Sequence, residues 1–141
     1  KTAMKRVKVS RKAHFNAAHR LYRKDWSDAQ NEAQFGKCSN PHYHGHNYEL
    51  IVSVEGEIDP ETGYVMDMKD LKDYIKSEVE DAFDHKNLNI EVPEFADLIP
   101  SAENMVVVIY DKLKKILSPG QTMEVVLYET PRNFVTYTEK G

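Results

Sequence analysis

The sequence predicts an α+β fold, in which a small antiparallel sheet carries two helices on one face. Three features of the chain support this prediction. Apolar and polar residues alternate near the N-terminus and again from residue 44, two apolar stripes at helical spacing follow, and two more alternating segments end the chain. This order of strand, strand, helix, helix, strand and strand differs from the regular alternation that builds a parallel sheet.

The first predicted strand covers residues 7–19. Its odd-numbered positions are mostly apolar and its even-numbered positions mostly polar, as in a strand with one face buried. His19 falls on the apolar face, at the end of this strand.

The segment 20–43 that follows contains one short predicted helix. Ser27 and Gln30 have the spacing of a capping box, in which each side chain accepts the backbone N–H of the other residue. Gly36 is a typical helix end. The pattern therefore predicts a helix over residues 28–35.

A second strand is predicted from His44 to Val54, with His44 and His46 on its more apolar face. The sequence Asp-Pro-Glu-Thr-Gly at 59–63 has proline and glycine where a turn needs them. We therefore expect residues 64–66 to return as a short strand.

Two helices are predicted in the middle of the chain. The first begins at Asp67, and the second begins at Ser101 with Glu103 in its first turn. The apolar stripes are Leu71, Tyr74, Ile75, Val79, Ala82 and Phe83 in the first helix and Val106, Ile109, Leu113, Ile116 and Leu117 in the second.

Two closing strands are predicted over residues 123–129 and 134–138, joined by a turn. Glu129 lies on the inward-facing side of its strand, where a carboxylate is rarely left unpaired. It could pair with a buried base. It could also accept hydrogen bonds from a ligand with adjacent N–H donors, such as a guanidine-like heterocycle.

The composition of the chain indicates which classes of protein it can belong to. The chain has 141 residues, 40% hydrophobic and 30% charged, which suits one domain spanning residues 1–141. It has no run of about 18 apolar residues and no signal-peptide core, so we expect a cytoplasmic protein without a membrane anchor. The net charge of -4 argues against a nucleic-acid binder, whose footprint is a basic face. A phosphorylated small substrate stays compatible, because a few local cations suffice to bind it.

His44 and His46 form the centre of a predicted metal site. Side chains two apart on a strand point the same way, about 6.6 Å apart along the backbone. His19 can join them, because paired strands lie about 4.8 Å apart. A single buried histidine is more often a hydrogen-bonded core residue. Three converging histidines instead favour zinc with an open fourth position, as in catalytic zinc sites.

Cys38 is the only cysteine of the chain and cannot form an internal disulfide. It could complete the zinc site as a fourth ligand, which would make the site structural. It could also act beside the metal as a base or nucleophile. Asp84-His85, expected in a polar loop, could relay a proton, although surface Asp-His pairs are common. Spacing alone does not decide between these alternatives.

Several motifs together resemble the 6-pyruvoyl-tetrahydropterin synthase family. In chain order they include Phe15-Asn-Ala-Ala-His19, Phe35-Gly-Lys-Cys38, His44-Gly-His46-Asn-Tyr48, Asp84-His85-Lys-Asn-Leu88, Glu103-Asn104 and Tyr128-Glu129-Thr130. The resemblance extends over residues 7–138 and is more specific than any single motif. It implies the tunnelling fold (T-fold), in which each subunit has a four-stranded antiparallel sheet and two helices. Three such subunits close a barrel, and two trimers form a homohexamer.

The resemblance also implies a lyase that acts on 7,8-dihydroneopterin triphosphate in tetrahydrobiopterin biosynthesis. Triphosphate is eliminated, the side-chain hydroxyls become ketones and the pterin ring is reduced, without nicotinamide. The implied residue roles are zinc binding by His19, His44 and His46, catalysis by the Cys38 thiolate with Asp84 and His85 of a neighbouring subunit, and pterin binding by Glu129 with help from Glu103.

Two departures from the family pattern concern the pocket mouth. Ser101-Ala102 stands where the resemblance implies Thr-Thr, and His42-Tyr43 replaces smaller residues. A related alternative is 6-carboxytetrahydropterin synthase of the queuosine pathway, which uses the same substrate but cleaves off the side chain. The spacing from Cys38 to His44 favours the pyruvoyl product. An alternative of another class is a non-catalytic zinc-stabilised module with Cys38 as fourth ligand.

Overall fold

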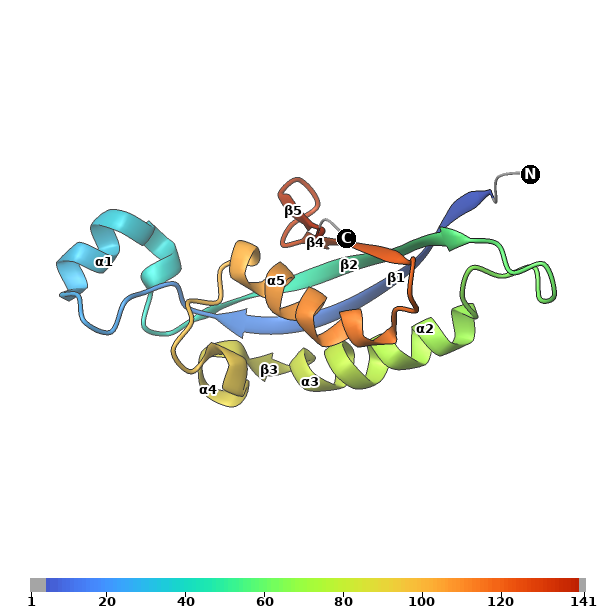
Figure 1. Cartoon of the computed structure of the whole chain (residues 1–141). Helices are drawn as coiled ribbons and strands as arrows, with labels where there is room; N and C mark the ends of the chain where they lie inside the picture. The colour runs from blue at the N-terminus through green and yellow to red at the C-terminus, as the bar shows by residue number, and fades with distance from the viewer. Residues whose placement is uncertain (1–4, 140–141) are drawn as a thin grey trace.

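The computed structural model describes residues 5–139 and contains one mixed sheet with long helices against one face (Figure 1). The sheet has five strands in the order β3-β1-β2-β4-β5. The ends of the predicted domain, residues 1–4 and 140–141, lie outside the described residues. Between residues 5 and 139, no helix combines the length and the hydropathy that crossing a bilayer requires.

Two long strands form the centre of the sheet. β1 (Arg6–His19) and β2 (His44–Glu57) pair antiparallel over their whole length, and the register places His19 opposite His44. Both strands agree with the predicted alternation. The histidine-bearing ends of the two strands therefore meet at the same end of the sheet.

Three shorter strands complete the sheet. β4 (Thr122–Tyr128) pairs antiparallel with β2, and β5 (Phe134–Tyr137) pairs antiparallel with β4. β3 (Lys86–Asn87) pairs parallel with β1 beside Ala17 and Ala18. The prediction of a four-stranded, purely antiparallel sheet was therefore wrong. A strand of two residues is too short for an alternating pattern to reveal it.

The strand expected over residues 64–66 does not form. The turn before it does close, because Asp59 N donates to Tyr64 O at 2.8 Å and Gly63 N donates to Asp59 O at 2.7 Å. The β4 side of β2 is paired over Glu49–Glu55, which ends just before the turn. There Gln121 Nε2 donates to Val65 O at 2.9 Å, so a side chain makes the hydrogen bond that a strand partner would make, and the chain leads directly into the next helix.

Two long helical segments cover one face of the sheet (Figure 1). The first consists of α2 (Met68–Ile75), a π turn (Lys76–Glu80) and α3 (Asp81–Phe83), and the second is α5 (Ala102–Leu113). This agrees with the predicted pair of helices. The remaining helical segments are α1 (Asp28–Phe35), α4 (Leu88–Glu91) and 3₁₀ turns at Gly36–Ser39, Pro93–Phe95 and Lys114–Ile116.

The helices begin at the predicted caps. Ser27 and Gln30 form the capping box of α1 (Asp28–Phe35). The side chains of Asp67 and Ser101 each accept a backbone N–H in the first turn of α2 and α5. These caps satisfy backbone donors that would otherwise have no partner inside the helix.

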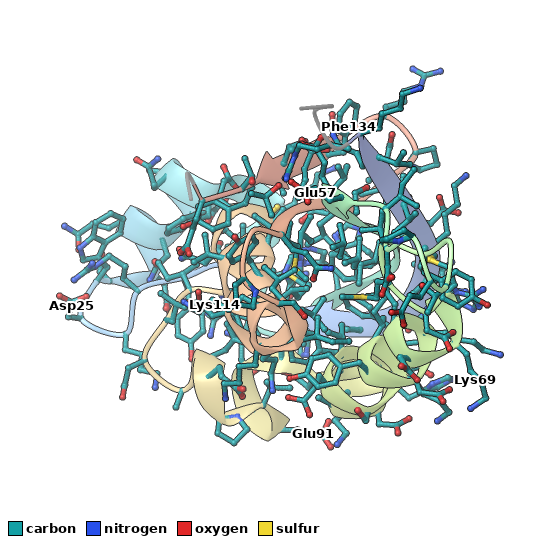
Figure 2. The ribbon with its side chains drawn as sticks, turned by 45° about the vertical axis from the view of Figure 1, so that its right-hand side comes forward. Asp25, Glu57, Lys69, Glu91, Lys114 and Phe134 are labelled. Atoms are coloured by element: carbon teal, nitrogen blue, oxygen red, sulfur yellow. The ribbon has the colours of Figure 1, made fainter. Side chains whose placement is uncertain are left out.

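The core lies between the sheet and the two helical segments. Its sheet-side members are Phe15, Ala17, Tyr48, Leu50, Val52, Val54, Met123, Val125 and Leu127, and α5 contributes Met105, Val106, Ile109, Tyr110 and Leu113. Charged residues such as Lys69 and Glu91 lie at the periphery (Figure 2). His19 is fully buried and continues the inner face to its end. The inner face of the sheet therefore changes from apolar to imidazole side chains along its length.

Candidate metal centre

Three imidazoles converge at the end of the inner sheet face. One nitrogen from each of His19, His44 and His46 lies within 4.8 Å of the other two. The ring centroids of His19 are 4.5 Å from His44 and 5.1 Å from His46. The structure thus brings the three predicted ligands together. That they bind zinc stays a prediction.

The nitrogens that face this space have no hydrogen-bond partner among the described residues. They are Nε2 of His19, Nδ1 of His44 and Nε2 of His46, and all three are buried. Buried polar atoms without a partner are rare and costly. Three converging imidazole lone pairs are a suitable donor set for Zn²⁺, which binds such nitrogens at about 2.1 Å. The residues present therefore fit the metal that the sequence predicted.

The orientation of His19 is set by groups outside the triad. Its Nδ1 lies 2.8 Å from the Pro100 carbonyl oxygen and 3.3 Å from the Tyr48 hydroxyl. Donation from Nδ1 to the carbonyl leaves the Nε2 lone pair facing the other two rings, as in many metal-binding histidines. The neighbouring Ile99 carbonyl accepts from Asn104 Nδ2 at 2.8 Å, which fixes this loop.

Sequence reasoning missed the supporting residues Tyr48 and Pro100. Tyr48 could have been found, because it follows His46 by two positions and shares its strand face. Pro100 had no such signal, because it is 81 positions from His19 in the chain. Local patterns do not report a contact of that separation.

Burial favours the neutral form of His19 and of His44. Desolvation lowers the pKa of His19 from 6.5 to about 4, against the raising effect of the Pro100 hydrogen bond. Burial and the nearby His46 lower the pKa of His44. Neutral imidazole is the form that binds a metal ion. Glu129 Oε2 lies 3.8 Å from His19 Nε2, and with a neutral ring this contact is not an ion pair near pH 7.

Cys38 is not a member of the triad. It sits in the 3₁₀ turn after α1, and its carbonyl accepts from Leu21 N at 2.8 Å. Burial raises the pKa of Tyr48 well above its usual value, and the Glu129 carboxylate adds to this. Among residues 5–139, the group that could hold a metal contains three histidines and no cysteine. The geometry does not support Cys38 as a fourth ligand.

Asp84 and His85 lie together, but at the outer edge of β1. His85 Nδ1 is 2.9 Å from Asp84 Oδ2, and Asp84 Oδ1 accepts from Asn16 N at 2.8 Å. The hydrogen bond from Asn16, followed by that from His85, lowers the pKa of Asp84. The His85 side chain is 82% exposed, and its backbone has a φ of 59°, in the left-handed region. Within one chain this pair projects outward.

Of the two predicted substrate-binding glutamates, one lies at the site. Glu129 follows β4 and borders a pocket of about 680 Å³, whose lining also includes His46, Tyr48 and Thr130. This volume suits a small organic ligand. Glu103 lies in the first turn of α5 and is exposed. The Glu129 carboxylate and the His46 imidazole of the triad therefore line the same pocket.

Comparison with known proteins identifies relatives of the whole fold. Residues 8–140 match the family model described as 6-pyruvoyl tetrahydropterin synthase. The 6-pyruvoyl tetrahydrobiopterin synthases of Pongo abelii and Homo sapiens are 51% and 50% identical over 131 residues, which is 93% of this chain and 90% of each relative. The solved structure of Caenorhabditis elegans 6-pyruvoyl tetrahydropterin synthase has a TM-score of 0.90 at 39% identity, covering 99% of this chain and 100% of that chain.

The triad predicts a measurable metal affinity. We expect the metal-free protein to bind Zn²⁺, and His46→Ala to weaken this binding by at least about 100-fold, because it removes one of three ligands. His42→Ala is the matched control, since His42 is exposed and lies outside the triad. Competition with a chromophoric chelator measures all three affinities. Unchanged affinity in His46→Ala would refute the ligand assignment.

The buried His19 predicts an acid-sensitive metal-free protein. Its folded-state pKa of about 4 lies below the ordinary value of 6.5. The unfolded chain therefore binds a proton first, and stability that is complete above pH 6.5 is lost as the pH falls toward 4. The loss should be about 3 kcal/mol. Urea unfolding between pH 7 and pH 4 measures it, and His19→Asn should flatten the decline. A constant free energy of unfolding over this window would show that His19 is not buried as a neutral ring.

Proposed function

This chain belongs to the 6-pyruvoyl tetrahydropterin synthase family, and we propose that it converts 7,8-dihydroneopterin triphosphate to 6-pyruvoyl-tetrahydropterin with release of triphosphate. The family makes it a lyase of tetrahydrobiopterin biosynthesis. The observation that best supports the proposed reaction is the convergence of three unpartnered imidazole nitrogens, beside a pocket lined by His46 and Glu129.

We assign His19, His44 and His46 as zinc ligands. Bound Zn²⁺ would supply Lewis-acid chemistry, which polarises the side-chain hydroxyls of the pterin and acidifies the adjoining C–H bonds. Burial lowers the pKa of His19 and of His44, which favours their neutral form, and Pro100 orients His19. These features prepare the site before substrate arrives.

Cys38 is the proposed proton acceptor. Its sulfur makes no disulfide, and it lies outside the metal-capable group. A nearby cation favours the thiolate, which is the basic form of this side chain. The redox change is internal to the substrate: side-chain carbons are oxidised, the ring is reduced, and triphosphate leaves with its bonding electron pair. The reaction therefore needs no external oxidant or reductant.

Glu129 is the proposed anchor of the pterin ring. Its side chain is 25% exposed and borders the pocket beside the triad. A carboxylate can accept two parallel hydrogen bonds from the amino-pyrimidine edge of a pterin. Glu103, which is exposed in the single chain, is assigned a supporting contact with the same ring.

A homohexamer would complete the site. The outward-facing Asp84–His85 pair is placed to act in a neighbouring copy, where His85 would tune the Cys38 thiolate and Asp84 would orient the imidazole. The sheet also ends in two short strands, β3 and β5, whose outer edges have no partner within the described chain. Pairing between subunits satisfies such edges.

The reaction itself is tested by product mass. Incubation of the zinc-loaded protein with 7,8-dihydroneopterin triphosphate should give 6-pyruvoyl-tetrahydropterin and free triphosphate in equal amounts. Mass spectrometry distinguishes this product from 6-carboxytetrahydropterin, which lacks two side-chain carbons. Formation of the carboxy product, or no turnover at all, would refute the proposal.

The thiol role predicts a separation of binding from turnover. Cys38→Ala should keep the fold and the Zn²⁺ affinity, because the sulfur is not a ligand, while turnover falls by about 10²-fold to 10⁴-fold, the usual contribution of a general base. Cys38→Ser is the isosteric comparison and should be similarly impaired, because a hydroxyl is a far weaker acid than a thiol. Full turnover by Cys38→Ala would exclude the proton-transfer role.

A further inference from the structure

Arg20, which follows the proposed ligand His19 directly, is held in place through both its backbone and its guanidinium. Arg20 N donates to Asn89 Oδ1 at 2.8 Å, and Asn89 Nδ2 donates back to Arg20 O at 2.9 Å. The Arg20 Nε donates to Ser39 O at 2.7 Å, and its Cζ lies 3.8 Å from the centroid of the Tyr22 ring. The charged group is therefore ordered without any ligand.

This guanidinium has no acidic partner within residues 5–139. Its two terminal nitrogens make no hydrogen bond there, and the side chain takes part in no ion pair, although the residue is half-buried. Arg23 shows the contrast, because its Nε and Nη2 bind both carboxylate oxygens of Asp25 at 2.9 and 2.8 Å. Figure 2 places Asp25 at the periphery of the molecule. An ordered arginine without a carboxylate is free to bind another anion.

Arg20 borders a surface hollow of about 630 Å³. Lys37, Ser39 and Asn40 line it as well, and Lys37 precedes Cys38 as Arg20 follows His19. Both cations are therefore sequence neighbours of residues at the proposed active site. Two exposed carboxylates, Asp28 and Glu32, also contribute to the lining. Because these carboxylates repel anions, a negatively charged ligand would bind on the side of the hollow that Arg20 and Lys37 line.

We propose that Arg20, assisted by Lys37, binds the phosphate chain of the substrate. This inference rests on the proposed function, in which the pterin side chain carries a triphosphate and is held at the triad. The two free terminal nitrogens of Arg20 match the bidentate geometry of phosphate oxygens. Because the side chain is already ordered, binding costs little conformational entropy. The same contact stabilises the negative charge of triphosphate as it leaves.

The test compares two neighbouring arginines. Calorimetry measures the binding of inorganic triphosphate to the zinc-loaded protein, and kinetics gives the KM for 7,8-dihydroneopterin triphosphate. Arg20→Gln should weaken triphosphate binding and raise KM by about 10-fold to 100-fold, the effect of losing hydrogen bonds between charged groups. Arg23→Gln is the matched control, because the Arg23 guanidinium is paired with Asp25, and it should leave both values unchanged. Arg20→Lys should bind triphosphate better than Arg20→Gln but less well than the unsubstituted protein, since lysine keeps the positive charge but lacks the two terminal nitrogens that bind phosphate together.

Further measurements separate the possible outcomes. Arg20→Gln should bind neopterin, which has no phosphate, and Zn²⁺ as the unsubstituted protein does. Equal loss of neopterin binding would show that Arg20 only supports the turn at Ser39, and would overturn the inference. Unchanged triphosphate binding and KM in Arg20→Gln would also overturn it, with the proposed function intact. Arg20-dependent triphosphate binding without formation of the pyruvoyl product would refute the proposed function and leave the anion site standing.

Discussion

The pairing register of β1 and β2 is the constraint on which the site depends. It places His19 opposite His44 and Ala17 opposite His46, with all three imidazoles on the buried face. A slip of one residue in either strand would move its histidine side chains to the other face. The large apolar residues on the same face oppose such a slip, because Phe15 and Tyr48 stack at 5.0 Å in the same register. Core packing and ligand geometry therefore select the same alignment.

The loop before α5 links the helix layer to this site. The Pro100 carbonyl orients His19, and Asn104 holds the adjacent Ile99 carbonyl from the first turn of the helix. Ser101 caps the same helix through the N–H of Asn104. One short segment thus begins a helix, satisfies its backbone donors and fixes the tautomer of an imidazole in the sheet. The contact that orients His19 therefore comes from the loop that begins α5 and needs no additional element.

The sequence predicted what repeats along the chain and missed what depends on single contacts. Alternation identified β1, β2 and the face of the three histidines, and the caps at Ser27 and Ser101 identified helix starts. Such features involve residues a few positions apart, whose spacing is visible in the sequence. The two-residue β3, the Pro100 contact and the unpaired state of Arg20 depend on segments far apart in the chain. The failed strand at 64–66 has the same origin, because the side chain of Gln121, 56 positions away, donates to the Val65 carbonyl.

The excursion between β1 and β2 brings the backbone of Cys38 back beside the end of β1. The chain leaves the sheet after His19, forms α1 beyond the end of β1 (Figure 1) and returns before His44. Two hydrogen bonds close this loop at its base, from Leu21 N to Cys38 O at 2.8 Å and from Arg20 Nε to Ser39 O at 2.7 Å. Closing a loop as long as residues 20–43 reduces the conformational entropy of the chain, so these contacts are needed to keep it closed. These contacts hold the backbone of Cys38 and Ser39 against Arg20 and Leu21, directly after the first predicted ligand.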